Sequence, residues 1–105
     1  MRQIIWTNFA ISELKNIFLY YRMVAGERTA VKIKKSIFAA TKPIIKHPLI
    51  GAEEENLKDL NQGHRYIVEG NYKIIYLIIG NEIYITDIFD WRQNPTKMKR
   101  MVSKD

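Results

Sequence analysis

The 105-residue chain contains no cysteine, so disulfide bonds and thiolate metal ligands are excluded. It has two histidines and five glycines, without the spacings typical of a metal site or a phosphate-cradling loop. The longest apolar run, Ile74 to Ile79, is far too short to span a bilayer. Polar and charged residues such as Ser12, Glu13 and Lys15 interrupt the first apolar stretch, so no secretory signal is visible. We therefore expect a soluble cytoplasmic protein with no metal, no cofactor and no membrane association.

Length and composition predict a single domain over residues 1–105. Hydrophobic residues make up 47% of the chain and charged residues 27%, which is ordinary for a globular protein. A chain of this size can bury about 60–70% of its unfolded surface, enough for one core without covalent staples.

Three apolar runs near the C-terminus predict strands: His64–Glu69, Tyr72–Ile79 and Glu82–Phe89. All are rich in isoleucine, valine or tyrosine, which pack well on a pleated surface. Gly70-Asn71 and Gly80-Asn81 separate the runs and supply the positive φ of tight hairpin turns. The pattern predicts an antiparallel three-stranded meander.

The N-terminal half predicts a strand followed by two helices. Residues Arg2–Trp6 form a short apolar segment, and Thr7 or Asn8 offers an N-cap to a helix that ends between Met23 and Gly26. A second apolar periodicity runs from Glu27 to Lys46.

Pro43 conflicts with the second helix, because proline removes a donor and kinks or ends a helix. Either the helix bends at Pro43 or it stops near Thr41. Residues 47–51 are expected to form a loop, and residues 53–60 a polar linker with Leu57 and Leu60 as packing anchors. The order β-α-α-β-β-β predicts an α+β fold with a two-helix hairpin packed on a mostly antiparallel four-stranded sheet.

The formal net charge is +6, which favours an anionic partner. Six cations and no acid lie between Arg28 and Lys46, whereas acids cluster at residues 53–55. This basic run is either a solvated helix face or a face that meets nucleic acid or an acidic protein.

The whole-chain order of motifs resembles the RelE/ParE superfamily of bacterial toxins, the toxic halves of type II toxin–antitoxin (plasmid stabilisation) systems. The points of likeness are Trp6 with Ala10 and Leu14, Pro48-Leu-Ile-Gly51, Arg65–Tyr76, Ile83–Ile88 and the closing Asp90-Trp-Arg-Gln-Asn-Pro95.

The resemblance implies a toxin that acts on one of two targets and is neutralised by a cognate antitoxin protein. Some members of this superfamily cleave ribosome-bound mRNA without a metal, and others poison DNA gyrase. A third possibility is an inactive relative that binds only antitoxin or DNA in autoregulation.

The resemblance also suggests Arg65, Lys73 and Arg92 as phosphate-handling residues, because RNase-type relatives place basic residues there. Guanidinium groups pair well with phosphate oxygens. Alternatively, each is a surface cation or pairs with a nearby acid such as Glu69 or Asp90.

The chain departs from RNase-type relatives in its tail. Those relatives carry a Tyr or His beyond the last arginine as general base or acid, whereas residues 93–105 contain neither and Met98 stands near that place. Lys97 or Lys99 would need a strongly depressed pKa to substitute. His64, next to Arg65, is a weaker catalytic candidate, and His47 is expected at the surface.

Four tyrosines of the meander either stack on RNA bases or pack within the sheet: Tyr66, Tyr72, Tyr76 and Tyr84. Alternation places Tyr72 and Tyr76 on one face and Lys73 on the other. Trp91 is expected to be a core or interface anchor.

Overall fold

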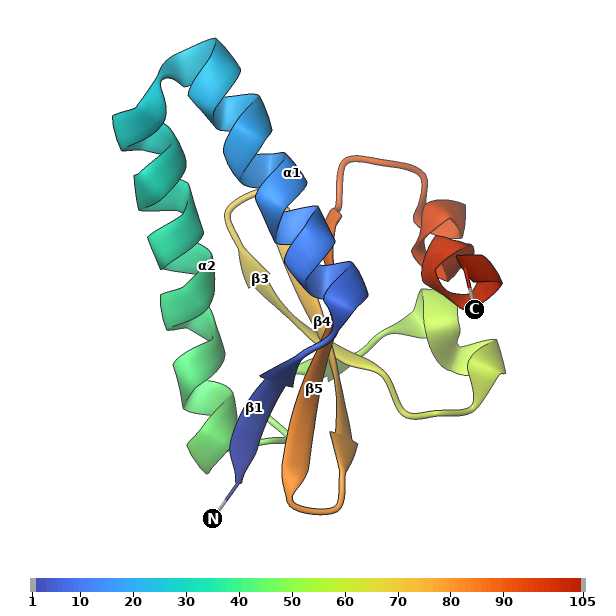
Figure 1. Ribbon diagram of the computed structural model, residues 1–105. Helices are drawn as coiled ribbons and strands as arrows, with labels where there is room; N and C mark the ends of the chain where they lie inside the picture. The colour runs from blue at the N-terminus through green and yellow to red at the C-terminus, as the bar shows by residue number, and fades with distance from the viewer. Residues whose placement is uncertain (1, 105) are drawn as a thin grey trace.

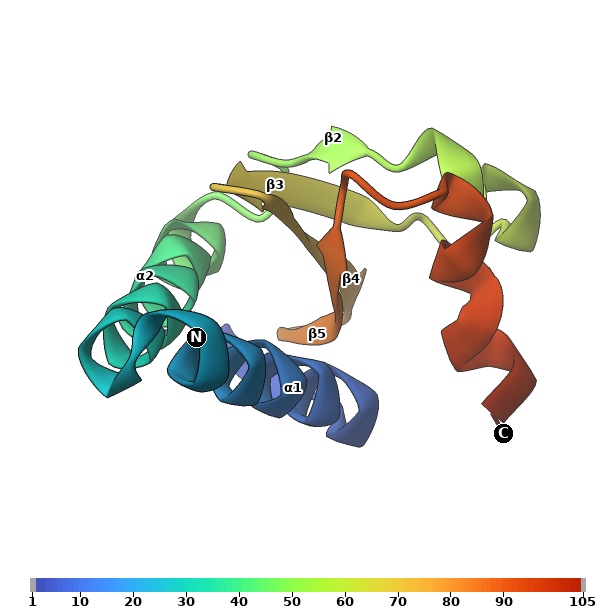
Figure 2. The same ribbon diagram turned by 90° about the horizontal axis from the view of Figure 1, so that it is seen from above.

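The computed structural model describes the backbone of residues 2–104 and the side chains of residues 2–100. Strand β1 (Gln3–Trp6) leads into helices α1 (Asn8–Ala25) and α2 (Glu27–Lys46), which form a hairpin. Strands β3 (Arg65–Glu69), β4 (Tyr72–Ile79) and β5 (Glu82–Asp90) follow as the expected meander. The helical hairpin covers one face of the sheet, and the C-terminal segment lies away from it (Figures 1 and 2).

The sheet has five strands in the order β1-β5-β4-β3-β2, and only β1 and β5 run parallel. This confirms the predicted α+β architecture but adds one strand. The additional strand, β2 (Ala52–Glu53), pairs with β3 through Glu53 and Arg65. Two residues are too few to produce a periodic signal, so sequence patterning could not reveal β2.

The polar segment after β2 is more ordered than expected. It forms a 3-10 helix, η1 (Glu55–Leu60), in which the Glu54 side chain caps the N-terminus by accepting from the Asn56 amide. Leu57 is buried and Leu60 packs against the same cluster. Both predicted anchors are confirmed.

Thr7 joins β1, α1 and β5. Its Oγ1 accepts a hydrogen bond from the amide of Ala10 at 3.1 Å, and therefore caps α1. The same hydroxyl donates to the carbonyl oxygen of Ile85 at 3.0 Å. This arrangement fixes the start of α1 against the sheet.

Helix α2 continues through Pro43 to Lys46, so of the two alternatives the helix does not stop at Thr41. Pro43 has no amide to donate to the carbonyl oxygen of Ala39, four residues earlier. Both residues are exposed, so water can reach this carbonyl. Within the same turn, the Thr41 hydroxyl donates to the carbonyl oxygen of Phe38 at 2.7 Å.

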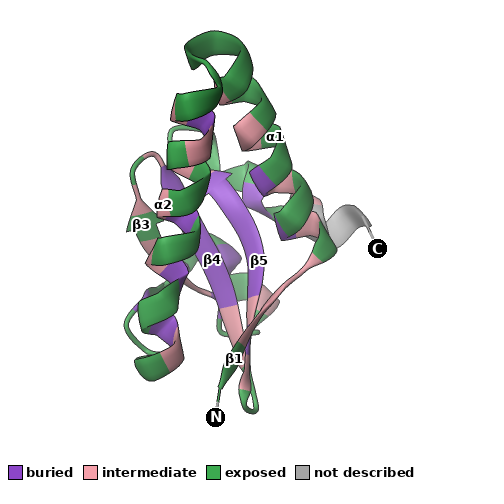
Figure 3. Ribbon diagram, turned by 60° about the vertical axis from the view of Figure 1, so that its left-hand side comes forward, coloured by how far each residue is buried: buried purple, intermediate pink, exposed green. Residues whose placement is uncertain are grey.

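The sheet separates two apolar clusters. Tyr72, Ile74 and Tyr76 pack against α1 and α2, whereas Ile75 and Phe89 pack on the opposite face. This confirms the predicted alternation along β4. Figure 3 shows the buried β4 and β5 lying behind helices whose outer faces are exposed.

The C-terminal segment forms a second 3-10 helix, η2 (Pro95–Lys104). Met98 is only 1% exposed and joins Leu57, Ile75 and Phe89 in the second cluster. The tail is therefore attached to the face of the sheet that the helical hairpin leaves open. Among the described residues, neither helix is both long enough and apolar enough to cross a bilayer.

Candidate functional site

The side chain of Arg65 is hydrogen-bonded to the loop that follows α2. Its Nη1 donates to the carbonyl oxygen of Gly51 at 2.6 Å. The hydroxyl of Tyr76 donates to the carbonyl oxygen of Pro48 at 2.6 Å and accepts from the amide of Gly51 at 2.9 Å. Together these contacts hold the loop, which has no regular structure of its own, against β3 and β4.

Lys73 forms an ion pair with a buried carboxylate. Its Nζ lies 2.8 Å from Oε2 of Glu54, whose side chain is nearly inaccessible. Burial raises the pKa of Glu54, but hydrogen bonds from Lys73 and Asn56 outweigh this effect and hold the pKa below its ordinary value. Lys73 also lies 4.2 Å above the centre of the Tyr66 ring. A cation held in this way stabilises the attachment of residues 54–60.

His64 lies beside the same pair and is buried. Burial lowers its pKa, and the charge of Glu54 opposes this effect only in part. A buried neutral imidazole has little access to a substrate. The position favours a structural role for His64, whereas His47 is exposed as expected.

Arg92 is half exposed and forms a bidentate pair with Asp90, with N–O distances of 2.9 and 2.6 Å. Hydrogen bonds from the guanidinium hold the pKa of Asp90 below its usual range. Both residues line a cavity of about 300 Å³ at the end of β5, with Tyr20 of α1, Tyr72 and Arg100.

The three predicted cations do not gather at one place. Residues paired across neighbouring strands lie on the same face of a sheet, and Arg65 pairs with Tyr76, whereas Lys73 pairs with Phe89. Arg65 and Lys73 therefore project from opposite faces. Arg92 follows Asp90, which pairs with Tyr72, about 13 Å along β4 from the partner of Arg65.

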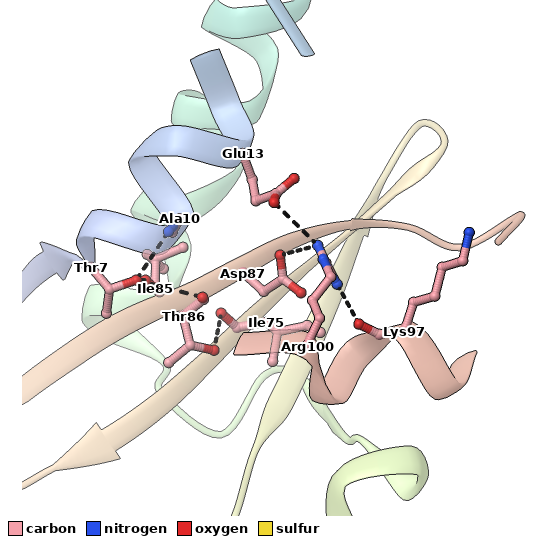
Figure 4. A network of polar contacts seen from close by, with 9 residues as sticks. All are labelled: Thr7, Ala10, Glu13, Ile75, Ile85, Thr86, Asp87, Lys97 and Arg100. Atoms are coloured by element: carbon pink, nitrogen blue, oxygen red, sulfur yellow. Dashed lines mark hydrogen bonds and ion pairs between the residues drawn. The ribbon is translucent and has the colours of Figure 1, made fainter. Parts of the chain in front are cut away.

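A second charged cluster, centred on Asp87 of β5, was missed by the sequence reasoning. Asp87 is fully buried, and Oδ1 accepts from Nη2 of Arg100 in η2 at 3.0 Å. The same Nη2 lies 3.6 Å from Oε1 of Glu13 in α1. Burial raises the pKa of Asp87 to about 6, although Arg100 acts to lower it. Figure 4 shows the guanidinium between Asp87 and Glu13.

Asp87 was detectable in principle, because it is the one acid inside the strand Ile83–Phe89. What could not be read from the pattern is the source of its partner. A bulge between β4 and β5 leaves Thr86 as an extra residue, and its hydroxyl donates to the carbonyl oxygen of Ile75 at 3.3 Å. The bulge reverses the alternation after Ile85 and so decides which way Asp87 points.

The aromatic residues divide between core and surface. Tyr72 and Tyr76 are buried, which confirms packing for these two tyrosines, while Tyr66 and Tyr84 are only partly buried. Trp91 is 48% exposed, and its indole nitrogen donates to the carbonyl oxygen of Gly70 at 3.0 Å. Trp91 is therefore not a core residue, and the interface alternative stays a prediction.

An apolar groove of about 500 Å³ lies between α1, α2 and β1. Its aromatic lining consists of Trp6, Phe18 and Phe38, and the ring centres of Trp6 and Phe38 lie 4.9 Å apart. Lys15 and Lys34 stand among the lining residues, and Ile11 is 51% exposed. Exposed apolar surface with polar residues around it is typical of an interaction site.

The structure thus shows three separate cations, each bound to its own intramolecular partner, and an apolar groove that none of them lines. Residues 4–95 match the family model described as "ParE toxin of type II toxin-antitoxin system, parDE". The chain belongs to this family of toxins, which confirms the superfamily predicted from the sequence.

A solved structure shares the fold. It is described as the "Chromosomal ParDE TA system from P. aeruginosa", and it is 23% identical to this chain with a TM-score of 0.73. The match covers 86% of this chain and 96% of that chain. No curated protein matches the chain.

Proposed function

We propose that this toxin inhibits growth by binding DNA gyrase, without cleaving RNA, and that a cognate antitoxin neutralises it. Membership of the ParE family supports the toxin role. The choice of gyrase depends on one structural observation, the separation of Arg65, Lys73 and Arg92.

A metal-free ribonuclease must collect cations around one phosphate and place a proton-transfer group beside it. Here each candidate cation is held by its own intramolecular partner, on surfaces that do not converge. In the described residues after Arg92, the position near which relatives place a base is taken by Met98, which is buried. Cleavage would require several of these contacts to be broken at once.

The experiment that tests the proposal is a supercoiling assay with purified gyrase, relaxed plasmid and increasing amounts of the folded protein. The expected result is loss of supercoiling in proportion to the toxin. Undiminished supercoiling at saturating toxin would refute the gyrase target.

A parallel assay tests the ribonuclease alternative with translating ribosomes and labelled mRNA. We expect no cleavage. Cleavage that the wild-type protein performs and Arg92→Ala abolishes would instead assign a nucleolytic role to Arg92. Normal growth of cells that express folded toxin without its partner would support the third possibility, an inactive relative.

The apolar groove is our proposed antitoxin site. Its exposed aromatic lining can receive an apolar anchor side chain of a partner, and Lys15 and Lys34 complement a segment with acidic flanks. A Phe38→Ala variant should weaken antitoxin binding, and the association rate of the wild type should fall as salt rises. A salt-independent rate would contradict an acidic partner.

A further inference from the structure

Helix α2 carries a straight row of cations on the side that faces away from the core. At about 100° per residue, its members all lie within about 40° of one line. Eighteen residues separate Arg28 from Lys46, which corresponds to about 27 Å along the helix. This cationic row consists of Arg28, Lys32, Lys35, Lys42 and Lys46.

The row lies opposite the buried stripe of the helix, which contains Ala30, Ile37, Thr41 and Ile44. All five cations are exposed, and the outer face of α2 is exposed along its length in Figure 3. The row is therefore a consequence of amphipathic packing that points every one of these charges into solvent.

None of these five cations forms an ion pair within the described residues. The ion pairs found there join other cations to acids of α1, β5, η1 and the segments around them. Glu69 lines the same cavity as Lys32, yet no ion pair joins the two. Unlike Lys73 and Arg92, which pair with Glu54 and Asp90, the cations of the row have no carboxylate partner among the described residues.

The side chains between the cations are short, and none of them is aromatic. An open hollow of about 470 Å³ over the N-terminal half of the row is lined by Val31, Ser36 and Ala39 between the cations. A protein partner would need a large apolar anchor, and a membrane would need an apolar helix face. The row offers neither a large apolar anchor nor an apolar helix face, because the apolar face of α2 packs in the core.

The composition of this surface fits a duplex better than a single strand. Proteins that hold single strands interleave cations with aromatic side chains that stack on bases. The aromatic side chain of α2, Phe38, is turned away from the row and packs on Trp6. A smooth line of cations over about 27 Å suits the regularly spaced phosphates of a duplex.

We propose that the outer face of α2 binds the phosphodiester backbone of a nucleic-acid duplex, independently of base sequence. This activity goes beyond the proposed gyrase target and does not depend on it. It would hold the toxin on the polymer through counterion release, so its affinity falls steeply with salt.

The test measures fluorescence anisotropy of a labelled duplex of mixed sequence, about 20 base pairs long, which exceeds the roughly 8 base pairs that the row spans. The full-length wild type is compared with Lys32→Gln/Lys35→Gln. The matched control is Lys58→Gln/Lys97→Gln, which removes the same charge from exposed residues of η1 and η2. Unfolding midpoints confirm that both variants are folded.

For the wild type, the logarithm of the binding constant should fall against the logarithm of salt with a slope of about −4 to −5. The row variant should lower the magnitude of this slope by about 2 and weaken binding by tenfold or more at about 50 mM salt. The control should retain the wild-type slope. DNA and RNA duplexes are titrated separately, and tight binding of one or both identifies the source.

Three outcomes would overturn the proposal. Equal losses in the two variants would mean that net charge alone is responsible. Tighter binding to a single strand than to either duplex would contradict the geometry. Binding to phosphatidylserine vesicles but not to either duplex, lost in the row variant, would assign the row to a membrane surface instead.

Discussion

Replacing Asp87 by Asn should change how the stability of the protein depends on pH. The carboxyl is fully buried and has a pKa of about 6, against about 3.9 in an unfolded chain. A raised pKa means that the folded state holds the proton more tightly. The stability that this proton provides is therefore complete below about pH 4 and is lost as the pH rises through about 6.

The magnitude follows from the shift. About two pKa units correspond to about 3 kcal/mol of unfolding free energy lost between pH 4 and pH 7. Asn cannot ionise, so Asp87→Asn lacks this loss. The difference in unfolding free energy between variant and wild type should therefore move by up to about 3 kcal/mol in favour of the variant across this interval.

Urea denaturation at pH 4, 5, 6 and 7 measures the effect. Acids whose pKa is lowered in the folded state, such as Glu54 and Asp90, destabilise both proteins equally at low pH and cancel in the difference. Arg100→Gln should move the transition to higher pH, because Arg100 lowers the pKa of Asp87. A difference that stays constant with pH would refute the reasoning.

Three further perturbations follow from the contacts. Gly51→Ala should lower the unfolding free energy by about 1–3 kcal/mol, because a Cβ there would lie 2.6 Å from both the Tyr66 carbonyl oxygen and the Tyr76 hydroxyl. Urea denaturation measures the loss, and an unchanged midpoint would contradict the prediction. Lys73→Met should lower the unfolding free energy by about 3–5 kcal/mol, because it leaves Glu54 buried and unpaired. Adding Glu54→Gln should restore most of this loss. A double variant that is no more stable than the single variant would refute the ion-pair argument. Arg92→Ala should leave the thermal midpoint unchanged, because its pair with Asp90 is at the surface; a clear fall would show that the pair is structural.

Much of the fold was predictable because local periodicity carried it. The helical stripes and strand alternation place nearly every element, and Gly70 and Gly80 both adopt the positive φ that the hairpin turns require. The elements that sequence patterning did not predict are short or depend on contacts with distant segments. Strand β2 exists only because β3 offers it an edge, and η2 is held by Met98, which enters a cluster formed by distant segments.

The candidate site was less predictable than the fold. Sequence identified Arg65, Lys73 and Arg92 as cations near strand ends, but their partners are Gly51, Glu54 and Asp90. Two of these partners lie 14 and 19 residues away in sequence. Pairing at such separations depends on which face each strand presents, and strand register determines that.

The amino-acid sequence alone determined the family, the order of the elements and the cationic row of α2, because each of these depends on residue type and local spacing. Tertiary structure decided which cations are neutralised and which remain exposed. A cation is neutralised only by a carboxylate within ion-pair distance, and a backbone carbonyl can hold its side chain by a hydrogen bond; only the packing of the sheet, the loop after α2 and the C-terminal segment brings those groups together.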